Sequence, residues 1–423
     1  MEVVHERCAG LDVHKKKIVA TVIVGPRKAD IETRTFGTVT QELRRLRDWL
    51  IEQRCSHVAM ESTGSYWKPV VNLLEDSDLG WSVINAAHIK NVPGRKTDVC
   101  DSVWIAQLLR HGLLRGSFIP DREMRELREL VRYRRTVIQE RSREVNRLQK
   151  ILEGANIKLG SVVSDIMGRS ALSMLKQMID GKDDPEALAD LALGRLKSKR
   201  PALVLALDGL MGAHQRFILA EQLGHIEEAN SRVERVSKEI EKRMSQYEAM
   251  IVAIDEIPGI GRTGAQEIIA EIGVDMSRFP SEKHISSWAK ISPGNNESAG
   301  KRKNTKTGKG NPWLGSTLVE AAWAAARCKD SYLSAQYRRI AARRGGKRAA
   351  VAVAHSMLVI IYCMLRDGTA YRDLGSDFFE RRDREAIARR ARRRLEALGY
   401  SVTLSDASDN SNEQETGAHT EAA

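Results

Sequence analysis

A long charged segment in the middle of the chain limits what this sequence can fold into. Residues 121–154, DREMRELRELVRYRRTVIQERSREVNRLQKILEG, contain no proline, and their only glycine is the last residue. Because proline and glycine are the residues that most disfavour a helix interior, we predict one long helix here. A second long stretch of this kind occurs further along the chain, and two such helices most simply pair with each other.

The partner is predicted between about residues 220 and 251. Apolar or aromatic residues recur there at steps of seven and three: Ile226, Ala229, Val233, Val236, Ile240 and Tyr247. Such spacing is typical of a coiled coil, although Arg243 interrupts the pattern. The two helices would form an antiparallel pair or the seam of a dimer, and the segment between them (ALADLALGRLKSK) also has a helical pattern.

The residues before this region alternate between strand and helix patterns. Two strands joined by a tight turn are predicted in residues 8–25, and a third in residues 31–39. Leucines and a tryptophan at helical spacing indicate a helix in residues 41–53. Short apolar runs in residues 56–61 and 81–86 flank another helix-like segment. This order predicts a mixed α/β sheet.

Composition favours a cytoplasmic protein that contacts nucleic acid. The net charge is +12 and the pI about 9.5, so an acidic partner is expected. The five cysteines include no CxxC pair, which argues against a zinc site or a disulfide framework. The charged opening residues do not resemble a signal peptide. The apolar run 349–365 is shorter than a membrane span and contains His355 and Ser356, so we predict a buried core helix and no membrane partner.

Four carboxylates are the candidate metal ligands. Asp12 lies within the first predicted strand, Glu61 ends another strand, and Asp98 and Asp101 lie within one turn of a helix. Asp98 has an alternative role as the polar cap of that helix. Converging carboxylates repel one another unless a cation lies between them, and Mg²⁺ prefers oxygen ligands.

A glycine-containing turn in residues 255–273, DEIPGIGRTGAQEIIAEIG, has the form of a helix-hairpin-helix. Gly259 and Gly261 would let the backbone approach a phosphate, next to the free N–H groups of a helix start. The alternative is an ordinary turn between two helices, packed in a core.

Ser298 lies in a polar, lysine-rich stretch between Trp288 and Trp313. Small residues flank it, and cations follow it: Lys301, Arg302, Lys303, Lys306 and Lys309. A serine that attacks a phosphodiester needs room and nearby cations. A solvated basic loop has the same composition, so the residues alone leave both interpretations open.

The motifs GLDVHKK, MESTGSYWKP and KTDVCDSVWIAQLL together resemble the amino-terminal DEDD domain of transposases of insertion-sequence family 110. The resemblance implies a RuvC-like, RNase H type fold in which Asp12, Glu61, Asp98 and Asp101 bind Mg²⁺. Ser102 departs slightly from the family, which usually has alanine there.

The later half of the chain resembles the carboxy-terminal transposase domain of the same family. In that family a serine in a Ser-Gly-Gly type motif is the nucleophile, and Ser298 in SAG is the matching position, with Ala299 in place of the first glycine. Ser292 is a nearby competing hydroxyl. The resemblance implies a transposase that forms a covalent phosphoserine, works as a dimer or tetramer, and is guided by a structured bridge RNA that pairs with target and donor DNA.

These observations predict four parts. They are a RuvC-like DEDD domain in residues 1–118, a helical coiled-coil region in 119–250, and a mostly helical transposase domain with the helix-hairpin-helix and the serine in 251–375. A basic helix and a disordered polar tail follow in 376–423.

Two rival functions remain at this stage. The first is a RuvC-like nuclease that cleaves DNA with metal-activated water and uses the basic loop for binding alone. The second is a degenerate transposase that only binds nucleic acid.

Overall fold

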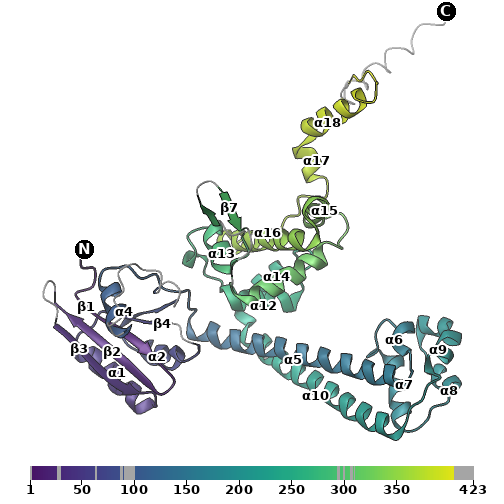
Figure 1. Ribbon diagram of the computed structural model, residues 1–423, viewed down its shortest axis with the longest axis horizontal. Helices are drawn as coiled ribbons and strands as arrows, with labels where there is room; N and C mark the ends of the chain where they lie inside the picture. The colour runs from purple at the N-terminus through teal and green to yellow at the C-terminus, as the bar shows by residue number, and fades with distance from the viewer. Residues whose placement is uncertain are drawn as a thin grey trace, which may run out of the picture. The chain divides into compact units, whose positions relative to one another are not determined.

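The structure is a computed structural model. It describes residues 2–25, 30–61, 64–85, 89, 101–292, 296–298, 301–304, 308 and 310–403, with the backbone alone for 296–298 and 301–304. The chain divides into two compact units, Met1–Glu126 and Leu127–Ala423. The division falls inside helix α5 (Arg122–Gly154). This helix confirms the long helix predicted from the charged segment (Figure 1). The boundaries of the four parts predicted above stay predictions.

A five-stranded mixed sheet forms the centre of the first unit. Its order is β3-β2-β1-β4-β5. The strands are β1 (Arg7–Val13), β2 (Lys17–Val24), β3 (Asp30–Gly37), β4 (His57–Glu61) and β5 (Gly80–Ile84). β2 pairs antiparallel with β1 and β3, whereas β1, β4 and β5 run parallel. This confirms the predicted mixed α/β sheet.

Helices cover both faces of this sheet. Leu46, Trp49 and Leu50 of α1 (Thr40–Glu52) share a core with Leu11, and α2 (Trp67–Leu74) adds to the same core. On the other face, α4 (Asp101–Arg110) packs with Cys8 and Ala59 of the strands.

The contact between α4 and β1 depends on a glycine. A Cβ atom on Gly10 would lie closer than 3.0 Å to the carbonyl oxygen of Ser102 and to the backbone nitrogen of Ala106. Real Cβ atoms do not approach that closely, so the helix lies directly on the backbone of the strand. This fixes the height of α4 above the sheet.

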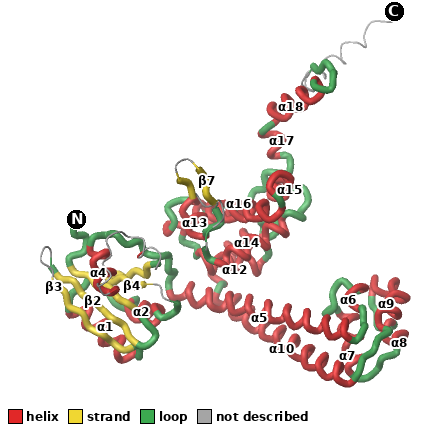
Figure 2. Tube along the Cα trace, viewed as in Figure 1, coloured by secondary structure: helices red, strands yellow, loops and turns green. Residues whose placement is uncertain are grey.

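In the second unit, α5 lies beside α10 (Ala213–Arg243) in an antiparallel pair (Figure 2). Arg141 donates to Asn230, and His225 lies 3.9 Å from Glu144. Positions 226, 229, 233, 236 and 240 of the predicted repeat are buried or half-buried. A supercoil and a dimer seam stay predictions.

The second long helix ends earlier than the sequence pattern predicts. α10 stops at Arg243, and a short 3-10 turn, η2 (Ser245–Tyr247), leads into α11 (Glu248–Asp255). Tyr247 therefore lies outside the helix, although it continues the seven-residue spacing. The interruption of the repeat at Arg243 marks the point where the helix ends.

A bundle of short helices packs against one end of the long pair. Its elements are α6 (Leu159–Val162), α7 (Arg169–Ile179), α8 (Pro185–Ala189), η1 (Gly194–Lys199) and α9 (Arg200–Leu207). Met174 and Leu203 of the bundle share one buried core with Leu148 of α5 and Ile226 of α10.

The rest of the second unit is mostly helical. It contains α12 (Arg262–Ile272), η3 (Met276–Arg278), α13 (Glu282–Ala289), β6 (Asn296–Ser298), β7 (Lys301–Asn304), α14 (Pro312–Ala325), α15 (Tyr332–Arg344), α16 (Gly346–Asp367), α17 (Phe378–Arg382) and α18 (Arg384–Glu396). α16 is the one helix of the described chain that is long and apolar enough to pass a test for a membrane span, and half of its most apolar window is buried. It packs against α13, α14 and α15, as predicted for a core helix.

Gly10→Ala tests the packing of α4 on β1. We expect it to lower the free energy of unfolding of the first unit by about 1–3 kcal/mol or more, because the added methyl group overlaps the backbone of α4. Gly224→Ala is the matched control: Gly224 lies inside α10 with no atom near the added methyl, and alanine there should stabilise by about 0.5–1 kcal/mol. Thermal and denaturant unfolding of both variants measures the difference. Equal stability of the two variants would contradict the close packing.

Candidate catalytic site

Two of the predicted carboxylates lie at the same edge of the sheet. β1 and β4 are parallel neighbours, and the last pair of their register joins Leu11 with Met60. Asp12 and Glu61 are the next residue of each strand. Both therefore lie at the carboxyl ends of adjacent parallel strands, which is where sites in such sheets are built.

The same two residues point toward the face that α4 covers. Cys8 of β1 and Ala59 of β4 belong to the buried cluster around Ala106 of α4. Because side chains alternate along a strand, residues two positions apart share a face. Asp12, on the face of Cys8, and Glu61, on the face of Ala59, thus lie on the α4 side.

The direction of α4 brings its first residue to this edge. The carbonyl oxygen of Arg110 accepts from the backbone of Val4 at 2.9 Å, and that of Ala106 accepts from the Cys8 thiol at 3.6 Å. The helix therefore runs antiparallel to β1, with its start toward Asp12. Asp101 is that start, and it is half-buried. Asp98 lies outside the described residues.

Three of the four predicted ligands thus share one edge and one face. Within the described part of the chain, no three His, Cys, Asp or Glu side chains are close enough together to hold a metal ion. The chemistry of the set still fits a hard divalent cation, because all four donors are carboxylate oxygens.

Asp12 has a neighbour that the sequence analysis missed. The Nε2 atom of His14 lies 2.9 Å from Oδ2 of Asp12, whose side chain is 19% exposed. An Asp-x-His pattern in a strand is a weak signal that could have indicated this contact, because positions i and i+2 share a face. His14 orients the carboxylate from its solvent side.

Ser102 stands where the family that this chain resembles usually has alanine, and its hydroxyl belongs to a chain of hydrogen-bonded hydroxyls. Its Oγ lies 2.8 Å from Oγ1 of Thr21, which lies 2.9 Å from Oγ1 of Thr33. Ser102 and Thr21 are fully buried. The extra hydroxyl is therefore hydrogen-bonded to β2 next to the site.

Ser298 lies at the end of a short antiparallel hairpin. β6 and β7 pair so that Ser298 is opposite Lys301, with two residues between them. The sequence predicted a polar stretch without periodicity, and three- to four-residue strands are too short to produce a clear pattern. Ser298 is the last residue of β6, opposite the start of β7, on which Arg302 and Lys303 follow. Lys306 and Lys309 fall outside the described residues.

The base of this hairpin segment is closed. A Cβ atom on Gly310 would lie closer than 3.0 Å to the carbonyl oxygen of Ala289, and one on Gly308 would touch the Lys290 side chain. Lys290 adopts a left-handed conformation with φ of 55° at the end of α13. The two ends of the segment that carries Ser298 therefore meet at one place.

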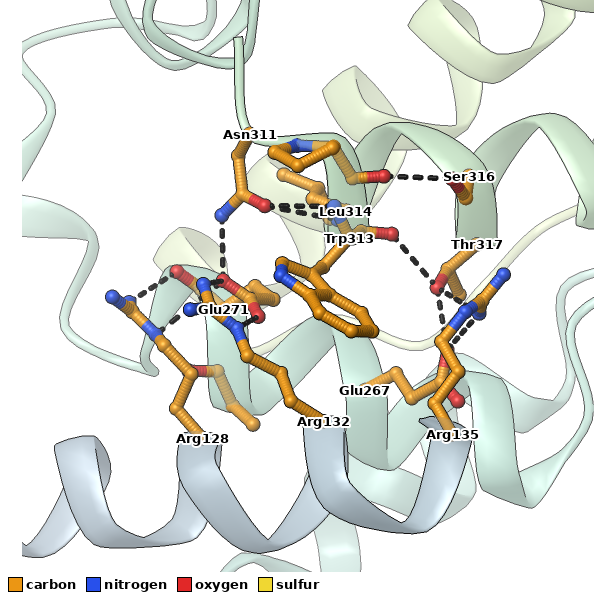
Figure 3. A network of polar contacts seen from close by, with 12 residues as sticks. Arg128, Arg132, Arg135, Glu267, Glu271, Asn311, Trp313, Leu314, Ser316 and Thr317 are labelled. Atoms are coloured by element: carbon orange, nitrogen blue, oxygen red, sulfur yellow. Dashed lines mark hydrogen bonds and ion pairs between the residues drawn. The ribbon is translucent and has the colours of Figure 1, made fainter. Parts of the chain in front are cut away.

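A buried ion-pair network anchors that base (Figure 3). Asn311 accepts from the backbone nitrogens of Trp313 and Leu314, and so caps α14, while its amide donates to Glu271 at 2.5 Å. Glu271 of α12 is 2% exposed. Arg132 of α5 holds it through two hydrogen bonds of 2.7 and 2.9 Å.

Further contacts extend this network on both sides. Arg128 donates to the carbonyl oxygens of Ala270 and Glu271 at 3.0 and 2.7 Å. Arg135 contacts Glu267 at 2.5 Å and donates to Thr317 of α14 at 2.8 Å. The long helix α5 is thereby joined to α12 and α14.

The turn predicted as a helix-hairpin-helix connects α11 and α12. Gly259 has φ of 90°, and a Cβ there would lie closer than 3.0 Å to the carbonyl oxygen of Ala321 in α14. Close packing against α14 therefore requires glycine at position 259. Gly261, which precedes α12, is exposed with open space around its Cα. Phosphate binding at these glycines stays a prediction.

Comparisons with known families match both halves of the chain. A model of the DEDD transposase domain of the IS110 family, described as "Transposase", matches residues 9–157. A model described as "Transposase IS116/IS110/IS902 family" matches residues 252–338. No curated protein matches the chain.

Among solved structures, similar chains include two of RuvC from Thermus thermophilus. One is described as RuvC in complex with Holliday junction substrate, with 15% sequence identity and a TM-score of 0.21. The other is described as the RuvC structure, with 14% identity and a TM-score of 0.21. Each match covers 26% of this chain and 99% of the RuvC chain.

Glu271→Gln tests the anchor of the hairpin base. We expect a loss of about 3–5 kcal/mol in unfolding free energy, because the half-buried Arg128 and Arg132 lose the charge of their buried partner. Glu320→Gln is the control: Glu320 also pairs with an arginine of α5 but is 69% exposed, so it should cost less than about 1 kcal/mol. Denaturant unfolding of the two variants checks this, and similar losses would refute the importance of the buried pair.

Proposed function

This chain belongs to the IS110 family of transposases, and we propose that it cuts and rejoins DNA through a covalent phosphoserine on Ser298. The single observation that carries the proposal is that one chain matches both domains of that family, the DEDD domain and the transposase domain. The position of Asp12 and Glu61 at one sheet edge, with the start of α4 directed toward it, and the hairpin position of Ser298 support it.

In the proposed reaction, the carboxylates bind the metal ion. Asp12 and Glu61 lie on adjacent strands on the face that α4 covers, α4 begins at Asp101, and Asp98 precedes Asp101 by three residues. They would hold divalent metal, with Mg²⁺ favoured by the all-oxygen donor set. Such an ion, when bound, stabilises negative charge on a phosphodiester. His14 fixes the orientation of Asp12.

Ser298 has the second role. Its Oγ would attack the phosphorus, so that an Oγ–P bond forms while the P–O3′ bond breaks. The serine proton ends on the released 3′ oxygen, which leaves a free 3′ hydroxyl and a phosphoserine. The pairing of Ser298 with Lys301 in the β6–β7 hairpin would bring a phosphate that approaches the serine next to the cations of β7. Lys301, Arg302 and Lys303 on β7 supply positive charge for the phosphate.

Partners follow from the family and the charge. A structured bridge RNA would guide the enzyme to donor and target DNA, and the net charge of +12 suits contact with both nucleic acids. The chain would act as a dimer or tetramer. Because Ser298 and the carboxylates belong to different units of the chain, the active site could combine the serine of one subunit with the carboxylates of another.

Ser298→Ala separates this proposal from a nuclease that uses water. We expect it to lower strand cleavage of DNA carrying the element's ends by at least about a thousandfold, because the nucleophile is lost. Ser292→Ala, at the neighbouring hydroxyl, should leave cleavage within about threefold. Gel assays with Mg²⁺ and RNA from the element's own locus provide the measurement. Cleavage retained by Ser298→Ala would favour the water-dependent nuclease.

Asp12→Asn tests the carboxylate edge. We expect cleavage to fall by at least about a hundredfold, with partial recovery as Mg²⁺ is raised, because one charged donor is replaced by a neutral one. Asp48→Asn is the control, since Asp48 is 56% exposed on α1 and pairs with Arg47. Cleavage rates are measured over a Mg²⁺ titration. A rate equal to that of the control would exclude Asp12 from the site.

A further inference from the structure

α17 and α18 carry charge that the catalytic account does not use. The family matches end at residue 338, before both helices. The sequence of α18, REAIARRARRRLE, has six arginines and two glutamates. No residue of either helix is buried, so these arginines do not form part of a core.

Four of these arginines have no counter-charge. Arg389, Arg390, Arg393 and Arg394 are exposed and form no ion pair within the described part of the chain, whereas Arg392 lies 3.3 Å from Glu396. They are spaced as two i, i+4 pairs, and like charges at that spacing destabilise a helix. Helix stability therefore does not explain their presence.

The start of α18 is nevertheless held in place. Asp383, the residue before it, accepts from Arg339 of α15 at 2.8 Å. Phe379 of α17 stacks on Tyr332 with ring centroids 5.2 Å apart, and the Arg339 guanidinium lies 4.9 Å from the centroid of the Phe379 ring. The basic helix is thus positioned by the transposase domain while its own surface stays uncovered.

A cavity of about 470 Å³ lies between α15 and these two helices. Arg338 and Arg343 of α15 and Arg390 of α18 line it, and none of the three has an ion-pair partner among the described residues. Its carboxylates are Asp330, Asp377, Glu380 and Asp383. Asp377 and Asp383 are paired with arginines, so three unpaired arginines face two unpaired carboxylates. The arginine surface of α18 therefore continues into a hollow on α15.

We propose that this surface, formed by Arg389, Arg390, Arg393 and Arg394 together with Arg338 and Arg343, binds the phosphate backbone of duplex DNA. Arginine is the side chain best suited to phosphate, because its planar fork donates two parallel hydrogen bonds. Contacts of this kind hold DNA without reading its sequence.

Duplex DNA suits this surface better than a membrane does. The two large apolar side chains of α18, Ile387 and Leu395, lie with Ala391 on one narrow stripe, and the other apolar residues are the small Ala386 and Ala388. Helices that lie in membranes have a broad apolar face. The assignment to DNA rests on the family but not on the chemistry of Ser298. Binding without divalent metal therefore tests it separately from cleavage.

The experiment compares full-length variants by fluorescence anisotropy with a random-sequence DNA duplex, without divalent metal. The test variant replaces Arg389, Arg390, Arg393 and Arg394 by glutamine. The control variant replaces Arg169, Lys182, Arg195 and Lys197 by neutral residues. These are exposed cations of the short-helix bundle without ion-pair partners in the described chain, so the control removes the same amount of charge. Between about 50 and 200 mM salt, each lost phosphate contact should reduce the slope of log affinity against log salt by about 0.9. For the test variant, we expect this slope to decrease in magnitude by about 3–4 and the affinity to fall at least about tenfold. For the control, we expect little change in either quantity.

Two further measurements test whether weaker binding comes from the lost charge or from unfolding. Both variants should keep the unfolding midpoint of the parent, because α18 has no buried residue. Replacing the four arginines by lysine keeps the charge and should keep the slope. The proposal is overturned by an unchanged slope in the glutamine variant, by an equal loss in the control, or by a loss confined to single-stranded RNA or anionic vesicles.

Discussion

The carboxy-terminal half depends on the ion pairs and the hydrogen bond that the buried carboxylate of Glu271 forms. A carboxylate that is 2% exposed is stable only when cations and donors surround it, and here Arg132, Arg128 and the amide of Asn311 do so. The same Asn311 caps α14 immediately after the hairpin segment. One buried charge therefore joins the long helix, α12 and the base of the segment that carries Ser298.

The amino-terminal unit depends on a different constraint, the direct contact of α4 with β1 at Gly10. Since α4 runs antiparallel to β1, that contact carries Asp101 to the edge where Asp12 and Glu61 end their strands. The two halves thus position their chemistry by unlike means: close backbone packing for the carboxylates, and buried arginine–glutamate pairs for the serine.

Much of this fold was predictable from the sequence because its signals are periodic. The first three strands, α1, and α5 follow from alternation, helical spacing and the absence of proline and glycine. The end of α10 was not predictable from the repeat, because Tyr247 continues the seven-residue spacing after the helix has stopped at Arg243. The strands β6 and β7 are too short for any periodic signal.

The candidate site was predictable to a similar extent. The sequence placed Asp12 within its first strand and Glu61 at the end of another, and in the structure Asp12 lies in β1 and Glu61 ends β4. The contact of His14 with Asp12 and the role of Gly259 against α14 depend on tertiary packing, which local patterns do not contain. The buried partner of Ser102, Thr21, lies 81 positions away in the chain, which no local pattern could have indicated.

The most direct test of the account is a mass-spectrometric search for a covalent protein–DNA adduct. The full-length protein would be incubated with Mg²⁺, RNA from its own locus and DNA carrying the ends of its element, then digested and sequenced. The account predicts a nucleotide remnant on Ser298 that is absent from Asp12→Asn. Cleaved DNA without any adduct would contradict it and would identify water as the nucleophile.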